Sequence, residues 1–170
     1  VAGSCASTSM SWMGNCTATV SAAASGANGT ANIPNPGCGS GYYGSATYSC
    51  LDGIFTYSSG SCTAVPACDT TPNAFTFADV TGANPSTLTT ATAITISGIN
   101  TTTPVSVSGG GAQISINGGA WTTSGNITNG QTLAVRLTSS ASFSTAANTT
   151  VTVGGVTDAP TRTELSPSHA

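Results

Sequence analysis

The sequence predicts an all-β protein in two parts, a small disulfide-rich β domain followed by a larger antiparallel β-sandwich. Five of the six cysteines lie within the first 65 residues. From Phe75 onward, apolar residues recur at alternate positions with Ser and Thr between them, which is the period of strands with one buried face. Glycine- and asparagine-rich turn signals separate these runs.

Residues 1–65 are predicted to form the small, loop-rich β domain. Its short β-like runs are CTATV, GSATYSC and GIFTYSSGSC. A core of this size is marginal, so disulfides are expected to contribute about 2–4 kcal/mol each. The even number of cysteines predicts that all are oxidised, as in an oxidising compartment. The disulfide cysteines are Cys5, Cys16, Cys38, Cys50, Cys62 and Cys68.

Residues 66–72 are predicted to be a short, stiff linker. The stretch VPACDTTPN contains two prolines and polar turn-forming residues that interrupt any strand pattern. Cys68 lies inside it. Because the cysteine count is even, a bond from Cys68 back to the first region is the simplest expectation.

Residues 73–158 are predicted to form the sandwich. About seven short strands in about 85 residues is the pattern of an immunoglobulin-like sandwich. Turn signals such as Asn117-Gly118-Gly119 and Asn129-Gly130 separate the strands. The residues expected to contribute most of the core are Ile94, Ile96, Val105, Val107, Ile114, Ile116, Leu133, Val135 and Leu137.

Residues 159–170 are predicted to be a tail or an inter-subunit segment. This stretch has prolines at 160 and 167 and no strand period. If ordered, it is expected to pack on its own domain or on a neighbouring subunit.

The charge content excludes most catalytic chemistry. The chain has Lys+Arg 2, Asp+Glu 5 and no lysine, and its one histidine, His169, is next to the C-terminus. Acid–base and nucleophilic catalysis need such groups close together. No HExxH or CxxC spacing provides a metal ligand set. We therefore predict no enzyme activity, no metal and no cofactor.

We also expect no nucleic-acid binding and no membrane-spanning segment. Two arginines against a net charge of -3 give no basic surface for phosphates. No apolar run approaches the ~20 residues of a spanning helix. The chain begins at Val1, as expected of a processed start or an excised fragment, so an export signal would lie upstream. With the cysteines, this predicts a secreted or cell-surface location.

The first region carries a family resemblance. SCASTSMSWMGNC followed by GSATYSCLDGIFTYSSGSC resembles small cysteine-paired repeats of bacterial extracellular surface proteins, which are similar to sushi modules. The sushi-like features are Tyr48, Cys50, Gly53, Phe55, where a tryptophan is usual, and Cys62.

The sushi-like resemblance implies that the first cysteine pairs with the third and the second with the fourth. Either Cys16 or Cys38 takes the second place. The other one then remains for Cys68.

The second region resembles an immunoglobulin-like repeat of large bacterial extracellular proteins. The matching stretches include DTTPNAFTFADVTGANPSTLTTATAITISGI, NGQTLAVRLTSSASFST and TVTVGGVTD. This resemblance implies a β-sandwich and an extracellular structural role, and it carries over no catalytic residue.

Aromatic residues are the candidates for ligand binding. Tyr42 and Tyr43, in the glycine-flanked stretch GSGYYGS, offer flat faces for stacking on sugar rings, as does Trp12. The alternative is that the tyrosines pack over a disulfide and that Trp12 and Trp121 are core or interface anchors. Turn formation is a simpler explanation of the aspartates than a calcium site.

Five asparagines match the N-glycosylation acceptor pattern, although a chain so rich in Ser and Thr produces some matches by chance. These candidates are Asn15, Asn28, Asn100, Asn126 and Asn148.

Low charge, β-rich patterning and the missing catalytic groups predict a non-catalytic extracellular structural protein. We expect a subunit of a bacterial surface filament, such as a pilus-like fibre, or of an adhesin stalk. Self-association into a homopolymer would use β-edge and terminal-segment contacts. The alternative is a carbohydrate- or surface-binding adhesion module with glycans as partners.

Overall fold

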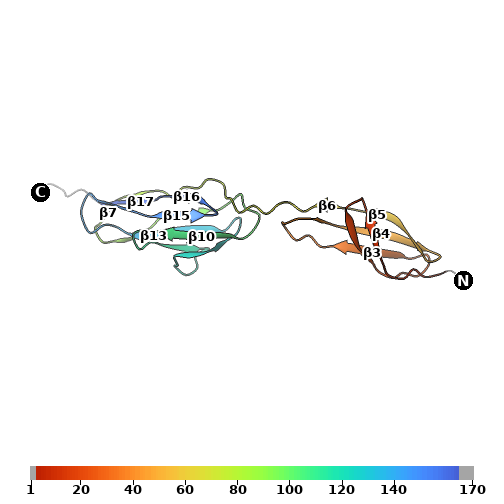
Figure 1. Ribbon diagram of the computed structural model, residues 1–170. Coiled ribbons are helices and arrows are strands. Elements are labelled where there is room, and N and C mark those ends of the chain that lie inside the picture. The colour runs from red at the N-terminus through yellow and green to blue at the C-terminus, as the bar shows by residue number, and fades with distance from the viewer. Residues whose placement is uncertain (1–2, 165–170) are drawn as a thin grey trace. The chain divides into compact units, whose positions relative to one another are not determined.

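The computed structural model describes residues 3–164, which contain strands and no helix (Figure 1). The predicted all-β class with disulfides is confirmed. The chain divides into two compact units, Val1–Cys68 and Asp69–Ala170. We describe each unit by itself. Leu165 and His169 of the expected tail lie outside the described residues.

The first unit contains a two-stranded hairpin and a sheet. Strand β1 pairs with β2, and the sheet has the order β3-β4-β5, with β6 pairing to the start of β4. The predicted runs CTATV, GSATYSC and GIFTYSSGSC lie on β2, β4 and β5. The strands are β1 (Thr8–Trp12), β2 (Cys16–Val20), β3 (Asn28–Ile33), β4 (Tyr42–Leu51), β5 (Ile54–Gly60) and β6 (Thr63–Ala64).

Strands β4 and β5 are joined by a two-residue turn. Asp52 and Gly53 have φ values of 49° and 84°, and Leu51 pairs with Ile54 across the turn. Positive φ at both positions matches the right-handed twist of the strands. The Asp-Gly pair in the sequence therefore specifies this hairpin.

Three disulfides cross-link the first unit, and no cysteine is free. They join Cys5 to Cys50, Cys16 to Cys62 and Cys38 to Cys68. Of the two alternatives left open by the sequence, the structure has the one in which Cys16 is the second cysteine. The hydrophobic core of this unit lies beside the Cys16–Cys62 bond and consists of Trp12, Cys16, Val20, Ala31, Ala46 and Tyr48.

The second unit contains three sheets. Their orders are β12-β10-β15-β16, β11-β13-β8 with β9 also paired to β13, and β14-β17-β7. All strand pairs are antiparallel except β17 with β7. The strands are β7 (Val80–Ala83), β8 (Leu88–Thr90), β9 (Ile94–Thr95), β10 (Thr103–Ser108), β11 (Gln113–Ile116), β12 (Ser124–Ile127), β13 (Thr132–Thr138), β14 (Ala146–Asn148), β15 (Thr150–Val153), β16 (Val156–Asp158) and β17 (Thr161–Glu164).

One hydrophobic cluster is shared by the sheets of β10 and β13. Seven of the nine predicted core residues are buried in it, and Ile94 and Ile116 pack against it while partly exposed. Alternation explains this result, because Leu133, Val135 and Leu137 of β13 all point to the same face. The immunoglobulin-like topology remains a prediction.

Two elements differ from the sequence prediction. Phe75 and Phe77 do not lie on a strand; Phe77 is buried, and its N–H donates to Asp158 Oδ2 at 2.8 Å. The expected tail contains strand β17, which lies between β14 and β7 of its own unit. This strand has no apolar period because its two buried positions hold Arg162 and Glu164.

Candidate functional site

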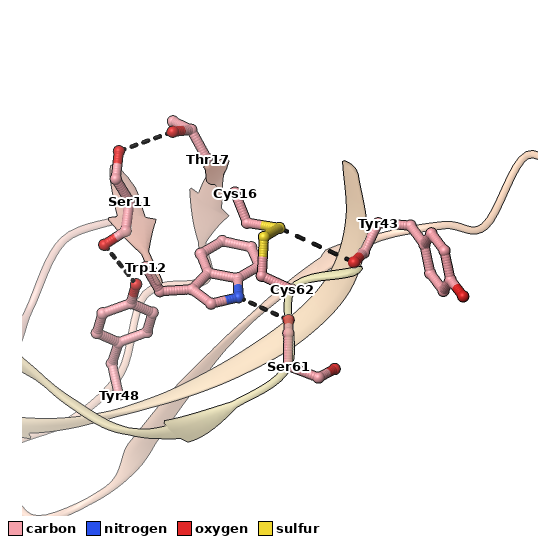
Figure 2. The surroundings of a disulfide bond; sticks show 8 residues. All are labelled: Ser11, Trp12, Cys16, Thr17, Tyr43, Tyr48, Ser61 and Cys62. Carbon is pink, nitrogen blue, oxygen red and sulfur yellow. Dashed lines mark hydrogen bonds between the residues drawn. A yellow bond between two sulfur atoms is a disulfide. The ribbon is translucent and has the colours of Figure 1, made fainter. Parts of the chain in front are cut away.

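Trp12 lies in the core beside the Cys16–Cys62 disulfide (Figure 2). Its side chain is 3% exposed, and its Nε1–H donates to the carbonyl oxygen of Ser61 at 2.8 Å. Gly44 allows the Ser61 carbonyl to lie close against β4, since a Cβ at Gly44 would be 2.0 Å from the Ser61 oxygen. A buried indole whose N–H is bonded has no face for a sugar. The structure thus places Trp12 as a core anchor, not a ligand-binding residue.

Tyr42 and Tyr43 lie at the start of β4 and do not form a platform with Trp12. Tyr42 is 39% exposed, and Tyr43 is half-buried with its ring directed away from the disulfide (Figure 2). The Tyr43 carbonyl oxygen is 3.9 Å from Cys16 Sγ, a contact without a hydrogen bond because a disulfide sulfur carries no hydrogen. Neighbouring residues of a strand point to opposite faces. The two tyrosines therefore do not share one stacking surface.

Tyr48, at the centre of β4, is the buried aromatic of the first unit. It is 1% exposed, and its hydroxyl donates to the Ser11 carbonyl oxygen at 3.3 Å. The rings of Phe55 and Tyr57 lie edge-on to it, with centroids at 6.3 Å and 5.7 Å. Burial raises the pKa of Tyr48 above its ordinary value of 10.0, and Tyr57 adds a smaller effect. Tyr48 therefore links the β1–β2 hairpin to the sheet that contains β4.

The raised pKa of Tyr48 predicts a loss of stability in alkali. Below pH 10 the folded and unfolded forms are both protonated; above it, the unfolded form loses its proton first, so folding weakens as pH rises through the raised pKa. Urea unfolding between pH 8 and pH 11 measures this effect. Tyr48→Phe should lower stability by about 0.5–1.5 kcal/mol at pH 8 through the lost hydrogen bond, yet reduce the alkaline slope. An unchanged slope would contradict this assignment.

The five candidate glycosylation asparagines all have exposed side chains. Asn15 lies in the turn between β1 and β2, and Asn28 begins β3. The other three belong to the second unit. Exposure is a requirement for modification, so each of the five meets it.

The hollows of the second unit are lined by uncharged groups. One, of about 360 Å³, lies against β10, β12 and β15; its lining includes Ser106, Asn126 and Thr152. Two further hollows are lined mainly by Asn, Thr and Gly residues. Hydroxyl and amide groups can hydrogen-bond a polar ligand, but they do not provide a general acid or base.

The described residues contain no group of three His, Cys, Asp or Glu side chains placed to hold a metal ion. Between residues 3 and 164 there is also no helix that is long and apolar enough to cross a membrane.

Sequence reasoning did not identify a cationic surface on the second unit. The Arg136 guanidinium lies 4.4 Å from the centre of the Trp121 ring, and its Nε and Nη2 donate to Gln113 Oε1 at 3.0 Å and 2.5 Å. The only local signal is that Arg136 occupies an outward position in the alternation LAVRL. Nothing in the sequence indicates that Trp121 lies beside it.

No family model, curated protein or solved structure matches this chain. Its function is therefore inferred from its own surfaces. Two surface features support such an inference. One is β5, an uncharged and exposed edge strand of the first unit, and the other is the Arg136–Trp121 pair of the second.

Proposed function

We propose that this protein is a non-catalytic extracellular structural protein, a subunit of a bacterial surface filament or adhesin stalk. Copies would associate through exposed sheet edges. The observation that carries the proposal is strand β5, Ile54–Gly60. It pairs with β4, and no other strand in the described part of the chain lies along its outer edge.

Strand β5 has few of the usual protections against edge pairing. Its sequence IFTYSSG contains no charged residue and no proline, and six of its seven residues are exposed. Natural edge strands are usually short, charged, interrupted by proline or bulged. The one such feature here is a bulge in β5 at Ser58, because Thr47 pairs with Ser59 while the next residue, Tyr48, pairs with Tyr57. The unpaired N–H and C=O groups along the outer edge of β5 are therefore suited to pair with another chain.

The charge balance supports self-association over a freely dispersed monomer. The chain carries seven charged side chains and a net charge of -3 over 170 residues, so electrostatic repulsion between copies is weak. Three disulfides are compatible with a secreted location, where thiols are oxidised.

Charging the edge should prevent assembly. We expect the full chain to form filaments in negative-stain electron microscopy and the Thr56→Lys/Ser58→Lys variant to stay monomeric in sedimentation. Each copy would bring two cations to an edge that must meet a neighbour, and like charges facing one another across a sheet are destabilising. The concentration needed for assembly should rise about tenfold or more, which corresponds to a loss of about 1.4 kcal/mol in the free energy of association.

The matched control is Ser45→Lys/Ser49→Lys. Both serines are exposed on β4, which is paired on both sides, so this variant adds the same charge without charging the edge. It should assemble like the unchanged chain. Equal assembly of the β5 variant would refute the edge proposal.

A carbohydrate- or surface-binding adhesion module is the second candidate. The observation in its favour is that Tyr42 and Tyr57 of the first unit are 39% and 43% exposed. Aromatic faces at the surface suit the C–H faces of sugars. A chain that remains monomeric at high concentration and binds on a glycan array would favour this function over the filament.

A further inference from the structure

Asp52 is the one carboxylate of the described residues without a hydrogen-bond partner. Each of the other four accepts a hydrogen bond from a backbone N–H, which explains its position structurally. Those four are Asp69, Asp79, Asp158 and Glu164. For Asp52, only the backbone N–H is bonded, to Ser25 Oγ at 3.2 Å. Its carboxylate is therefore available to a partner.

Two exposed aliphatic residues flank this free carboxylate. Leu51 is 66% and Ile54 is 68% exposed, and they pair with each other across the turn. We call Leu51, Asp52, Gly53 and Ile54 the hairpin tip. Exposed apolar residues grouped around a polar one are typical of interaction surfaces.

The second unit carries the complementary charge. Arg162 is fully buried and the chain has no lysine, so Arg136 is the only side-chain cation at the surface of the part that the structure describes. Its Nε and Nη2 are held by Gln113, whereas its Nη1 has no hydrogen-bond partner in that part of the chain. The guanidinium is thus fixed in position, with one nitrogen free to donate to a carboxylate.

Apolar groups flank Arg136 as well. Trp121 lies against its guanidinium. Arg136 pairs with Thr90, and Thr138, two positions along β13, pairs with Leu88. Directly paired residues point to the same face, so Leu88 shares the outer face with Arg136, and it is 54% exposed. We call Trp121, Arg136 and Leu88 the cation face.

We propose that the hairpin tip of one copy binds the cation face of a second copy, with Asp52 accepting a hydrogen bond from Arg136. This proposal rests on the proposed function and names the surfaces that meet. An acid between two aliphatic residues matches a cation between an aromatic and an aliphatic one. Tip and face are different surfaces, so each copy can use both, and such a heterologous contact repeats into an open chain when its rotation does not close a ring.

The apolar flanks decide whether the ion pair contributes. An isolated surface pair is worth little because water screens it. Leu51 and Ile54 packed on Trp121 and Leu88 would exclude that water and strengthen the pair. Ile54 also begins β5, so the tip and the exposed edge belong to one hairpin. The ion pair would therefore set the register in which the edge meets its neighbour.

Sedimentation of the full chain and of charge variants tests the contact. Asp52→Asn removes the charge and suits the positive φ of 49°, since Asn tolerates the left-handed region. We expect Asp52→Asn and Arg136→Gln each to raise the concentration needed for assembly about tenfold. The control Asp69→Asn changes net charge equally and keeps an acceptor for the Thr71 N–H, so it should not alter assembly.

A reversed pair gives the decisive result. Asp52→Lys and Arg136→Glu should each weaken assembly, and the double variant should recover it to within about threefold, as expected for directly coupled residues. Retained disulfides and circular dichroism confirm that each variant folds. If the single variants assemble normally, or the double variant shows no recovery, the contact is wrong while the filament proposal stands. A wild-type chain that never assembles would overturn both proposals.

Discussion

Replacing Cys16 and Cys62 together by alanine should unfold most of the first unit while the second unit stays folded. The bond joins residues 46 apart, and a closed loop of that length is worth about 4 kcal/mol of chain entropy in the unfolded state. Cys16 is also 0% exposed and packs in the core with Trp12, so its loss leaves a cavity. A domain of this size has a total stability of only about 3–10 kcal/mol.

Hydrogen exchange of the full chain measures this prediction unit by unit. Amides of β4 should lose protection by about 1,000-fold, which corresponds to about 4 kcal/mol. Cys38→Ala/Cys68→Ala is the matched control, because its loop of 30 residues has a similar entropy but its cysteines are not in the buried core. The β4 amides of that variant should lose less protection. Full protection of β4 without the Cys16–Cys62 bond would contradict a disulfide-dependent core.

Ending the chain at Ala159 should destabilise the second unit by about 3 kcal/mol or more. Strand β17 hydrogen-bonds to β14 on one side and β7 on the other, so its removal leaves both without a partner. Each backbone hydrogen bond contributes about 0.5–1.5 kcal/mol net. The Asp79 carboxylate also loses the Thr161 N–H, which it accepts at 2.8 Å.

Because β17 contains Arg162, its removal should cost less stability than the removal of an apolar strand would. The Arg162 guanidinium is buried, which lowers its pKa, and nearby Asp79 only partly offsets this. Arg162 Nη2 and Glu164 Oε2 are buried without hydrogen-bond partners. Such atoms cost about 1–3 kcal/mol each. Arg162 Nε does donate to Thr89 Oγ1 at 3.0 Å, but the two unpartnered atoms reduce what the side chains of β17 add to its backbone ladders.

Thermal unfolding monitored on the second unit compares the two chain lengths. A chain ending at Glu164 is the control, since it keeps β17 and removes only the residues after it. Its comparison with the chain that ends at Ala159 isolates the contribution of β17. If the chain ending at Ala159 is equally stable, β17 is dispensable and the segment is free for other contacts.

Alternation predicted the parts of the fold in which apolar and polar residues exchange faces. Leu133, Val135 and Leu137 follow this rule and are all 0% exposed. Strand β17 breaks it, because charged residues occupy the inward positions and no hydropathy pattern can locate such a strand. The prediction of a strand at Phe77 was wrong for another reason, because its buried ring belongs to a segment that does not pair with any described strand.

The surfaces were less predictable than the core. The sequence identified Trp12 as an anchor or a ligand-binding residue, and its burial together with its hydrogen bond to Ser61 distinguishes the two. Asp52 is recognisable as a turn residue, but its lack of a partner depends on where every other polar group lies. The Arg136–Trp121 pair depends on how Trp121, outside the named strands, returns to β13. Local sequence does not contain such information.

The disulfide pattern also determines how far the first unit can extend under tension. A pull between Cys5 and Cys68 enters through the bond to Cys50 and leaves through the bond to Cys38. The shortest covalent route then follows the chain only between Cys38 and Cys50. With the sheet fully unfolded, Cys5 and Cys68 of the oxidised unit could lie at most about 50 Å apart, whereas in the reduced chain they could reach about 210 Å. The cross-links act as a mechanical stop, so a load that disrupts the sheet lengthens the oxidised molecule only slightly.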